Sequence, residues 1–455
     1  MATNGRATVG QAIERGAYRC SGCGHRSMQW FGRCPGCGLW EGATATKAGD
    51  GAPDLEITTL EAARQGSDRF SSGNPEVDRV LGGGFVDGEV LLLTGEPGIG
   101  KSTLVLQLLD GLVAGGKRPL LATGEESPAQ VALRARRLGV SPQHVRVAAT
   151  TSVDALVAAC SAEAPDVLVV DSIQTLEDLA LEQAPGSTVQ VRECAARLVR
   201  HAKDTGLVVV LVGHVTKEGS SAGPKTLEHV VDAVVTLEGE RSGAVRVLRA
   251  AKNRFGSCEE AGVFTMGERG LAPVADPSAM LLEDRRPGVT GSVVFPGLEG
   301  SRCVLLEVQA LITRGSFSPP RRVALGVDSR RLSLLVGVLS KRAGLPLGDQ
   351  DVFVSAAGGL SVREPAADLA VCLAAFSSYA DAPVEPCAVA VGEVGLSGEV
   401  RRVPGTERRL REAFRLGFTK AMVPAGSMDR PRGMDVVEIT DLASALRAVA
   451  SALRA

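Results

Sequence analysis

The octapeptide Gly95–Ser102 is the sequence feature that most constrains the fold of this chain. Its residues, Gly-Glu-Pro-Gly-Ile-Gly-Lys-Ser, match G-x-x-x-x-G-K-[ST] at every fixed position. It follows the apolar segment Val90–Thr94 and opens the helical pattern Thr103–Leu112, which is the strand–loop–helix setting that the motif requires. Glycines let backbone N–H groups surround phosphates, and a helix start favours negative charge. The segment therefore predicts a nucleotide site.

Each part of this loop has a predicted task. Lys101 is expected to reach the β- and γ-phosphates, and Ser102 to ligate Mg²⁺. The expected nucleotide contacts are Gly95, Glu96, Pro97, Gly98, Ile99, Gly100, Lys101, Ser102 and Thr103.

Acidic residues follow two other strand-like segments. Asp171 ends the apolar run 167–170 and is expected to be a second magnesium contact, or alternatively a helix N-cap, a part that Ser172 could also play. Glu125 and Glu126 follow the segment Pro119–Thr123. If that strand neighbours the phosphate loop, one of the two could orient or deprotonate the attacking water; otherwise the pair is a polar helix start.

Short β-branched runs alternate with helix-length segments from residue 60 to about 273. This alternation predicts an α/β fold with a mostly parallel sheet flanked by helices. The closely spaced runs Ala233–Glu238, Val245–Ala251 and Gly262–Met266 are expected to extend the sheet in antiparallel fashion. A second α/β segment runs from about residue 279 to the end of the chain.

Composition excludes some classes of protein. A formal charge of −2 excludes a globally basic protein that coats nucleic acid, although a local binding channel is compatible with it. No apolar run approaches the ~20 residues of a membrane-spanning helix. The first 16 residues lack the apolar stretch of a signal peptide, so we expect a cytoplasmic protein without membrane contact.

Four of the ten cysteines form two C-x-x-C pairs, Cys20 with Cys23 and Cys34 with Cys37. Four thiolates at this spacing can surround one tetrahedral zinc ion in a closed, structural site. A unit this small has little core, so metal and aromatic side chains must supply its stability. The alternative is a pair of redox disulfides, which paired knuckles do not favour.

Four features together resemble the RadA (Sms) family of bacterial recombination proteins. They are the phosphate loop, Gly124-Glu125-Glu126-Ser127, the strand Leu168–Asp171 and the pentapeptide Lys252-Asn253-Arg254-Phe255-Gly256. The resemblance covers nearly the whole chain. It implies a RecA-like ATPase core that uses ATP, Mg²⁺ and Zn²⁺.

The resemblance also implies roles for individual residues. Glu125 is similar to the catalytic glutamate of RecA-like ATPases, and His214 stands where RecA has a glutamine that senses the γ-phosphate. Lys252 and Arg254 resemble cationic fingers that reach the nucleotide of a neighbouring subunit. The alternative is that both side chains face solvent at a strand end.

Two segments resemble the DNA-contacting loops of RecA-like proteins, namely Val215–Glu228 and Ser172–Gln190. Lys217, Lys225 and Arg192 are the expected contacts to the phosphates of single-stranded DNA. Neither loop has an aromatic residue for base stacking, so this expectation depends chiefly on the resemblance.

The carboxy-terminal region resembles the proteolytic domain of Lon, most clearly over 358–370 and 392–400. Lon proteases pair a serine with a lysine, but here Ala366 stands at the serine position and Glu407 at the lysine position. Both members of the nucleophile–base pair are therefore absent, which predicts a proteolytically inert domain.

These patterns predict a zinc ribbon (1–43), a linker (44–59), a RecA-like P-loop ATPase core (60–278) and an inert Lon-protease-like α/β domain (279–455). The leading hypothesis is a DNA-dependent ATPase motor of homologous recombination and repair. It would promote branch migration on single-stranded and branched DNA as a hexameric ring, with the RecA recombinase as a partner. The alternatives are an ATP-dependent protease of the Lon type and a regulatory ATPase scaffold.

Overall fold

The computed structural model describes residues 17–21, 26–27, 30–35, 37–40, 43–46, 69–141, 144–213, 226–239, 243–315, 319–359, 362, 364–427 and 430–452. The chain divides into two compact units, Met1–Gly66 and Ser67–Ala455. Among the helices described, none is both long and apolar enough to cross a membrane.

The first unit contains a three-stranded antiparallel sheet in the order β2-β1-β3. Its strands are β1 Ala17–Cys20, β2 Arg26–Ser27 and β3 Ala43–Thr46. Thr44 to Thr46, which the sequence analysis placed in the linker, pair with β1 instead. Two β-branched threonines in an Ala-Thr-Ala-Thr alternation suit a strand, and this outweighs the small-residue composition that suggested a linker.

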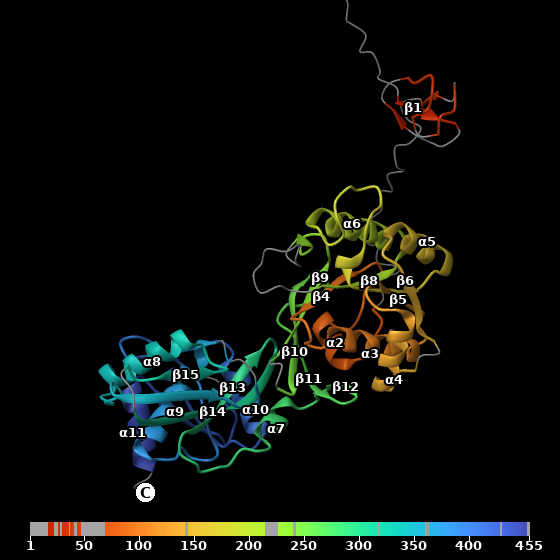
Figure 1. Cartoon of the computed structure of the whole chain (residues 1–455). Coiled ribbons are helices and arrows are strands. Elements are labelled where there is room, and N and C mark those ends of the chain that lie inside the picture. Colours follow the sequence, from red (N-terminus) through yellow and green to blue (C-terminus); the bar gives the residue numbers. More distant parts are fainter. Residues whose placement is uncertain are drawn as a thin grey trace, which may run out of the picture. The chain divides into compact units, whose positions relative to one another are not determined.

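A nine-stranded sheet in the order β12-β11-β10-β9-β4-β8-β7-β5-β6 begins the second unit (Figure 1). The strands are β4 Val90–Gly95, β5 Pro119–Thr123, β6 Arg146–Ala149, β7 Val167–Asp171, β8 Val208–Val212, β9 Ala233–Glu238, β10 Val245–Asn253, β11 Ala261–Gly267 and β12 Gly270–Pro273. The six strands from β6 to β9 across the sheet are all mutually parallel. The predicted α/β class with a mostly parallel sheet is confirmed.

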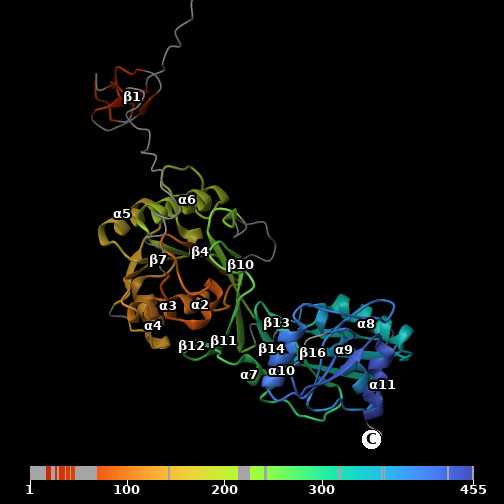
Figure 2. The same cartoon turned by 180° about the vertical axis from the view of Figure 1, so that it is seen from behind.

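The central strands are apolar along most of their length, so both faces of the sheet must be covered, and helices cover them. On β4, Leu91 and Leu93 pack with helices α2, α3 and α4, whereas Val90 and Leu92 pack with α5 and α6. Figures 1 and 2 show these two helical layers on either side of the strands. The helices are α2 Pro75–Leu81, α3 Lys101–Ala114, α4 Pro128–Leu138, α5 Val153–Glu163 and α6 Thr188–Thr205.

One strand direction differs from the expectation. β9 runs parallel to β4, and only β10, β11 and β12 extend the sheet in antiparallel fashion. The prediction for Ala233–Glu238 was therefore wrong. The close spacing of β9 and β10 does give an antiparallel pair, but the connection from β8 brings β9 into the sheet parallel to β4.

A seven-stranded sheet in the order β15-β16-β14-β13-β17-β20-β21 follows, with a separate two-stranded sheet β18-β19. The strands are β13 Ser292–Glu299, β14 Arg302–Arg314, β15 Arg322–Leu325, β16 Gln350–Ala356, β17 Ala388–Ala390, β18 Glu393–Val394, β19 Val400–Arg401, β20 Lys420–Pro424 and β21 Asp435–Ile439. The helices are α7 Pro277–Leu282, α8 Ser329–Arg342, α9 Asp368–Ala380, α10 Thr406–Arg415 and α11 Leu442–Ala452. Apolar residues of α8, α9 and α11 share one core, and α10 packs in another on the opposite face of β13 and β14.

Candidate nucleotide and metal sites

The phosphate loop joins the end of β4 to the start of α3, as the motif requires. Two of its glycines are needed for steric reasons. A Cβ on Gly95 would lie 2.5 Å from the carbonyl oxygen of Leu237, and one on Gly100 would lie 2.6 Å from the methyl group of Met266. Both glycines also have positive φ angles. At Gly95 the backbone of Leu237 leaves no room for a side chain, whereas at Gly100 the Met266 methyl group could move and the left-handed φ angle is what favours glycine.

Lys101 is buried within this loop, with 4% of the residue exposed. Its Nζ donates hydrogen bonds to the carbonyl oxygens of Gly95 at 2.8 Å and Glu96 at 3.1 Å. Burial lowers the pKa of Lys101, and the nearby Asp171 carboxylate opposes that shift. The ammonium is thus held by carbonyl oxygens of the phosphate loop.

The predicted acidic residues lie at the same edge of the sheet as the phosphate loop. In the strand register, four residues form one row across the sheet: Leu93 of β4, Val212 of β8, Asp171 of β7 and Thr123 of β5. This row crosses four neighbouring strands at their carboxyl ends. Parallel strands of an α/β sheet place ligand-binding groups at this edge.

Asp171 is half-buried and ends β7, whereas the next 3₁₀ helix, Ile173–Thr175, has Ser172 at its N-cap position. The helix-cap alternative for Asp171 therefore does not apply. Ser102 is also half-buried, at the first turn of α3. A hydroxyl and a carboxylate are the oxygen donors that Mg²⁺ prefers, so these two residues fit such an ion.

The structure distinguishes Glu125 from Glu126. Oε1 of Glu125 accepts a hydrogen bond from the hydroxyl of Ser172 at 3.1 Å, which directs this carboxylate toward the end of β7. Glu126 instead forms a 2.9 Å ion pair with Arg134 of α4. β5 neighbours β7 and β6 and does not neighbour β4, so the predicted adjacency of this strand to the phosphate loop is not found, and Glu125 lies beside the end of β7.

The turn between β11 and β12 also borders the site, which the sequence analysis missed. A hollow of about 640 Å³ lies beside Thr103, lined also by Arg137, Leu138 and the turn residues Met266 to Gly270. Gln107 of α3 fixes the turn, because it accepts from the backbone N–H of Leu271 at 2.9 Å and donates to the Leu271 carbonyl oxygen at 3.0 Å. A polar residue four positions after Thr103, on the same helix face, was the available signal.

Three predicted residues, His214, Lys217 and Lys225, lie outside the described residues. The last residue described before them, Gly213, donates its N–H to the carbonyl oxygen of Leu93 at 2.9 Å. The chain therefore leaves β8 at the edge that carries the phosphate loop. The third predicted DNA contact, Arg192, is exposed on α6.

The segment from Ser172 to Gln190 is packed against the start of α6. The buried Gln190 side chain accepts from the N–H of Asp178 at 2.8 Å and donates to the carbonyl oxygens of Asp178 and Gln183 at 3.1 and 2.9 Å. Arg197 forms a 2.8 Å ion pair with Asp178. The hydrogen bond from the Ala180 N–H, and then the one from Arg197, lower the pKa of the Asp178 carboxyl. A fixed side-chain amide thus shapes a segment that was expected to contact DNA.

Lys252 of β10 and Arg254, which follows that strand, lie toward the amino ends of the parallel strands, whereas the phosphate loop lies at their carboxyl ends. Lys252 aligns with Val234 near the start of β9, and Val234 aligns with Leu92 near the start of β4. Nζ of Lys252 donates to the carbonyl oxygens of Glu228 and Val231, both at 2.7 Å. Arg254 forms a 3.2 Å ion pair with Asp232 and keeps 55% of its side chain exposed. The solvent-facing alternative therefore does not describe Lys252.

Burial lowers the pKa of Lys252, and the neighbouring Arg254 guanidinium lowers it further, against the opposing effect of Asp232. The two cations are thus close enough for the charge of Arg254 to affect Lys252.

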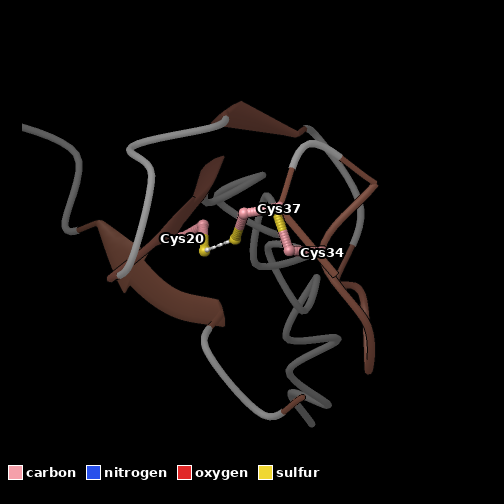
Figure 3. Close-up of side chains that lie close together, drawn as sticks. All are labelled: Cys20, Cys34 and Cys37. Carbon is pink, nitrogen blue, oxygen red and sulfur yellow. Dashed lines mark hydrogen bonds between the residues drawn. The ribbon is translucent and has the colours of Figure 1, made fainter. Parts of the chain in front are cut away.

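Three of the four predicted zinc ligands, Cys20, Cys34 and Cys37, come together in the first unit (Figure 3). Their sulfur atoms all lie within 4.8 Å of one another, and Sγ of Cys20 is 3.6 Å from Sγ of Cys37. Sulfurs bound tetrahedrally to zinc at about 2.3 Å are about 3.8 Å apart, whereas a disulfide bond is about 2.05 Å long. This cluster fits a zinc ion and does not fit a Cys20–Cys37 disulfide. Cys23 lies outside the described residues.

Comparison with protein families gives two matches. Residues 58–220 match the model of an AAA domain, and residues 18–42 match the model of a rubredoxin metal binding domain. The two matches fall on the phosphate-loop region and on the cysteine cluster, so they support ATP and zinc as the ligands of the two units.

Relatives with curated names match almost the whole chain. The DNA repair protein RadA of Pseudomonas aeruginosa is 46% identical over 445 residues, which are 95% of this chain and 98% of the relative. The DNA repair protein RadA of Bacillus subtilis is 44% identical over 454 residues, covering 96% and 99% of the two chains. Among solved structures, a KaiC-like protein of Pyrococcus horikoshii is 22% identical with a TM-score of 0.39, covering 46% of this chain and 99% of its own. On the extent and identity of the two full-length matches, the chain belongs to the RadA family of DNA repair proteins.

Proposed function

We propose that this protein is a DNA-dependent ATPase motor that acts in homologous recombination and repair, where it promotes branch migration on single-stranded DNA. The observation that carries the proposal is the division of the proposed catalytic groups between the two ends of the parallel strands. At the carboxyl ends of the parallel strands lie Lys101, Asp171 and Glu125. Toward their amino ends lie Lys252 and Arg254. This division suits an enzyme whose active sites form between subunits.

Within one subunit, the groups at the phosphate-loop edge are suited to hold ATP and to activate water. The loop N–H groups and Lys101 would bind the phosphates, and Ser102 and Asp171 would hold Mg²⁺, which when bound neutralises phosphate charge. Glu125 is suited to orient the attacking water, because Ser172 fixes its carboxylate next to Asp171. The hollow beside Thr103 would take the base.

The second half of each site would come from the neighbouring subunit. β4 extends from Val90, where Asp232 and Arg254 lie, to Gly95, and five residues of strand span about 16 Å. Lys252 and Arg254 are thus turned away from the phosphate loop of their own chain. A closed ring, for which we propose six subunits, would bring them to the loop of the next one, as heterologous interfaces do.

The proposed partners are single-stranded and branched DNA and the RecA recombinase, in the cytoplasm. His214, Lys217, Lys225 and Arg192 keep the sensing and DNA-contacting roles that the resemblance implies. We also propose the division into a zinc ribbon, a RecA-like core and an inert Lon-protease-like domain.

A Lon-type protease is disfavoured by the residues around Ala366, which is buried. Glu364 accepts two hydrogen bonds from the buried Arg409, at 2.9 Å to Nη1 and 2.5 Å to Nη2. Arg409 follows Glu407, the residue at the lysine position, by two. This ion pair supplies neither a nucleophile nor a neutral amine base.

Extension of a three-strand recombination intermediate tests the proposed function. Branch migration is expected with ATP and is expected to be lost without ATP or in Lys101→Ala. ATP turnover should also rise with single-stranded DNA. A regulatory scaffold predicts ATP binding with neither DNA stimulation nor extension, and a protease predicts ATP-dependent cleavage of an unfolded protein.

A further inference from the structure

Asp232 is a buried carboxylate near Lys252 and Arg254, toward the amino ends of the parallel strands. It directly precedes β9, and only 4% of its side chain is exposed. Oδ2 accepts from the backbone N–H of Val90 at 3.0 Å and from Nζ of Lys203 at 2.5 Å, and Oδ1 accepts from Nη1 of Arg254 at 3.2 Å. The carboxylate therefore joins the start of β4, helix α6 and the end of β10.

Asp232 also holds Arg254 through the backbone. The N–H of Arg254 donates to the carbonyl oxygen of Asp232 at 3.2 Å, so main chain and side chain of Arg254 both bind one residue. Only Nη1 of the guanidinium contacts the carboxylate, and 55% of the Arg254 side chain is exposed. A guanidinium is a rigid fork of five N–H donors, so one edge can bind a carboxylate while another binds a second anion.

The other residues of the pentapeptide Lys252–Gly256 fix the backbone around Arg254. Asn253 accepts from the N–H of Phe255 at 2.9 Å, and Arg69 donates to the carbonyl oxygen of Phe255. A Cβ on Gly256 would lie 3.2 Å from the carbonyl oxygen of Leu81, which keeps this position small. The main chain that carries Arg254 is thus held on both sides, and preorganised cations are the ones that stabilise a transition state.

We propose that Asp232 is a positioning residue for Arg254: it fixes one edge of the guanidinium so that the exposed edge meets the γ-phosphate held by the neighbouring subunit. This inference depends on the proposed function, in which Arg254 acts across a subunit interface. In this role Asp232 would act on the nucleotide only through Arg254, which its carboxylate binds. Its charge also balances the pair of cations, which would otherwise repel each other.

The variant Asp232→Asn tests this role, because asparagine keeps the shape and an acceptor oxygen but removes the charge. We expect kcat of DNA-stimulated ATP hydrolysis to fall about tenfold or more, with KM changed less than about twofold, since only transition-state stabilisation is lost. Lys203→Gln is the matched control. It removes the other cation on the same carboxylate and should leave kcat within about twofold of the unmodified protein.

A double variant separates positioning from a merely structural role. Asp232→Asn combined with Arg254→Ala should be no slower than Arg254→Ala alone, because residues that act as a unit are not additive. Asp232→Asn subunits should also regain turnover when mixed with Lys101→Ala subunits, since the defect lies on the side that supplies the cations. Multiplicative losses in the double variant, or no recovery on mixing, would overturn the proposal.

The two proposals fail in different ways. If Arg254→Ala hydrolyses ATP normally, the proposed role of Arg254 is wrong. If Arg254→Ala is slow and Asp232→Asn is not, only the positioning role of Asp232 is wrong. If Asp232→Asn does not fold, the substitution is made in the Lys203→Gln background, where loss of the carboxylate leaves no lysine ammonium unpaired beside it. A kcat of this double variant equal to that of Lys203→Gln alone would equally overturn the inference.

Discussion

Lys101 lies at the carboxyl ends of the parallel strands of the nine-stranded sheet, whereas the side chain of Lys252 extends toward their amino ends. Lys101 hydrogen-bonds the carbonyl oxygen of Gly95, the last residue of β4, whereas Lys252 is level with Leu92 and donates toward Glu228 and Val231. Three residues of strand separate Leu92 from Gly95 by about 10 Å, and the side chain of Lys252 extends away from Gly95, toward the residues that precede β9. Under the proposed function, one chain therefore carries the phosphate loop of one active site and the cations of another.

Replacement of Lys101 by alanine should abolish catalysis while the chain stays folded. We expect kcat for ATP to fall at least about 100-fold, because the cation at the phosphates is lost. The ammonium hydrogen-bonds only loop carbonyl oxygens, and its burial lowers its pKa, so its removal should not lower the thermal unfolding midpoint. Steady-state turnover and a melting curve check the two statements, and a strongly lowered midpoint would contradict the second.

The sequence predicted the central strands well because they are buried on both faces. The bounds of β5 and β7 match the predicted runs Pro119–Thr123 and Val167–Asp171, since continuous apolar segments that end at polar residues leave little choice. Helix α8 was missed, although Leu332, Leu335, Val336 and Leu339 are buried at helical spacing. The direction of β9 depends on where a long connection returns the chain, which no local pattern encodes.

The candidate site was predictable to a similar degree. The phosphate loop and Asp171 lie where strand–loop–helix logic predicts them. The choice between Glu125 and Glu126 depends on Ser172 and Arg134, which come from distant parts of the sequence. Asp232 gave no signal at all, because a carboxylate before a strand acquires meaning only when Arg254 folds against it.

Loss of one cysteine should remove zinc and leave nucleotide binding intact. In Cys34→Ser, zinc content measured after denaturation should fall from about one ion per chain to well below half, because three thiolates rarely retain a structural zinc. Cys258→Ser, an exposed cysteine of the second unit, is the control and should retain its zinc. Unchanged zinc in Cys34→Ser would rule out the assigned ligand.

The ion pair between Arg409 and Glu364 should be a stability element of the carboxy-terminal region. Arg409→Ala leaves a partly buried Glu364 without its guanidinium, and breaking such a pair costs about 3–5 kcal/mol. We expect a lowered unfolding midpoint with no gain of proteolysis. Arg411→Ala, which removes an exposed partner of Glu407 on the same helix, should change the midpoint little. Equal effects of the two variants would contradict this assignment.

Glu89 should make stability depend on pH between about 4.5 and 7. Burial is the largest cause that raises the pKa of Glu89 to about 7, with Asp232 adding to it and the N–H of Val86 opposing it. In the unfolded chain the pKa of Glu89 is near its ordinary value of 4.5, so protonation favours the folded state. Its stabilising contribution is complete below that value and is lost as the pH rises toward 7.

Glu89→Gln removes this titration and keeps an acceptor for Val86. The free energy of unfolding of this variant, relative to that of the unmodified chain, should rise between pH 5 and pH 8 by up to about 3 kcal/mol, and its unfolding midpoint should rise accordingly. A midpoint difference that is constant over this range would contradict the buried, protonated state of Glu89.

Mixing inactive subunits tests the central claim most directly. Lys101→Ala and Lys252→Ala are each expected to be inactive alone. In a randomly mixed one-to-one ring, about a quarter of the interfaces join an intact phosphate loop to an intact Lys252. DNA-stimulated ATP turnover should therefore return on mixing to a fraction of the unmodified rate. If no mixing ratio restores turnover, although the subunits exchange, the two half-sites do not meet across an interface and the account is wrong.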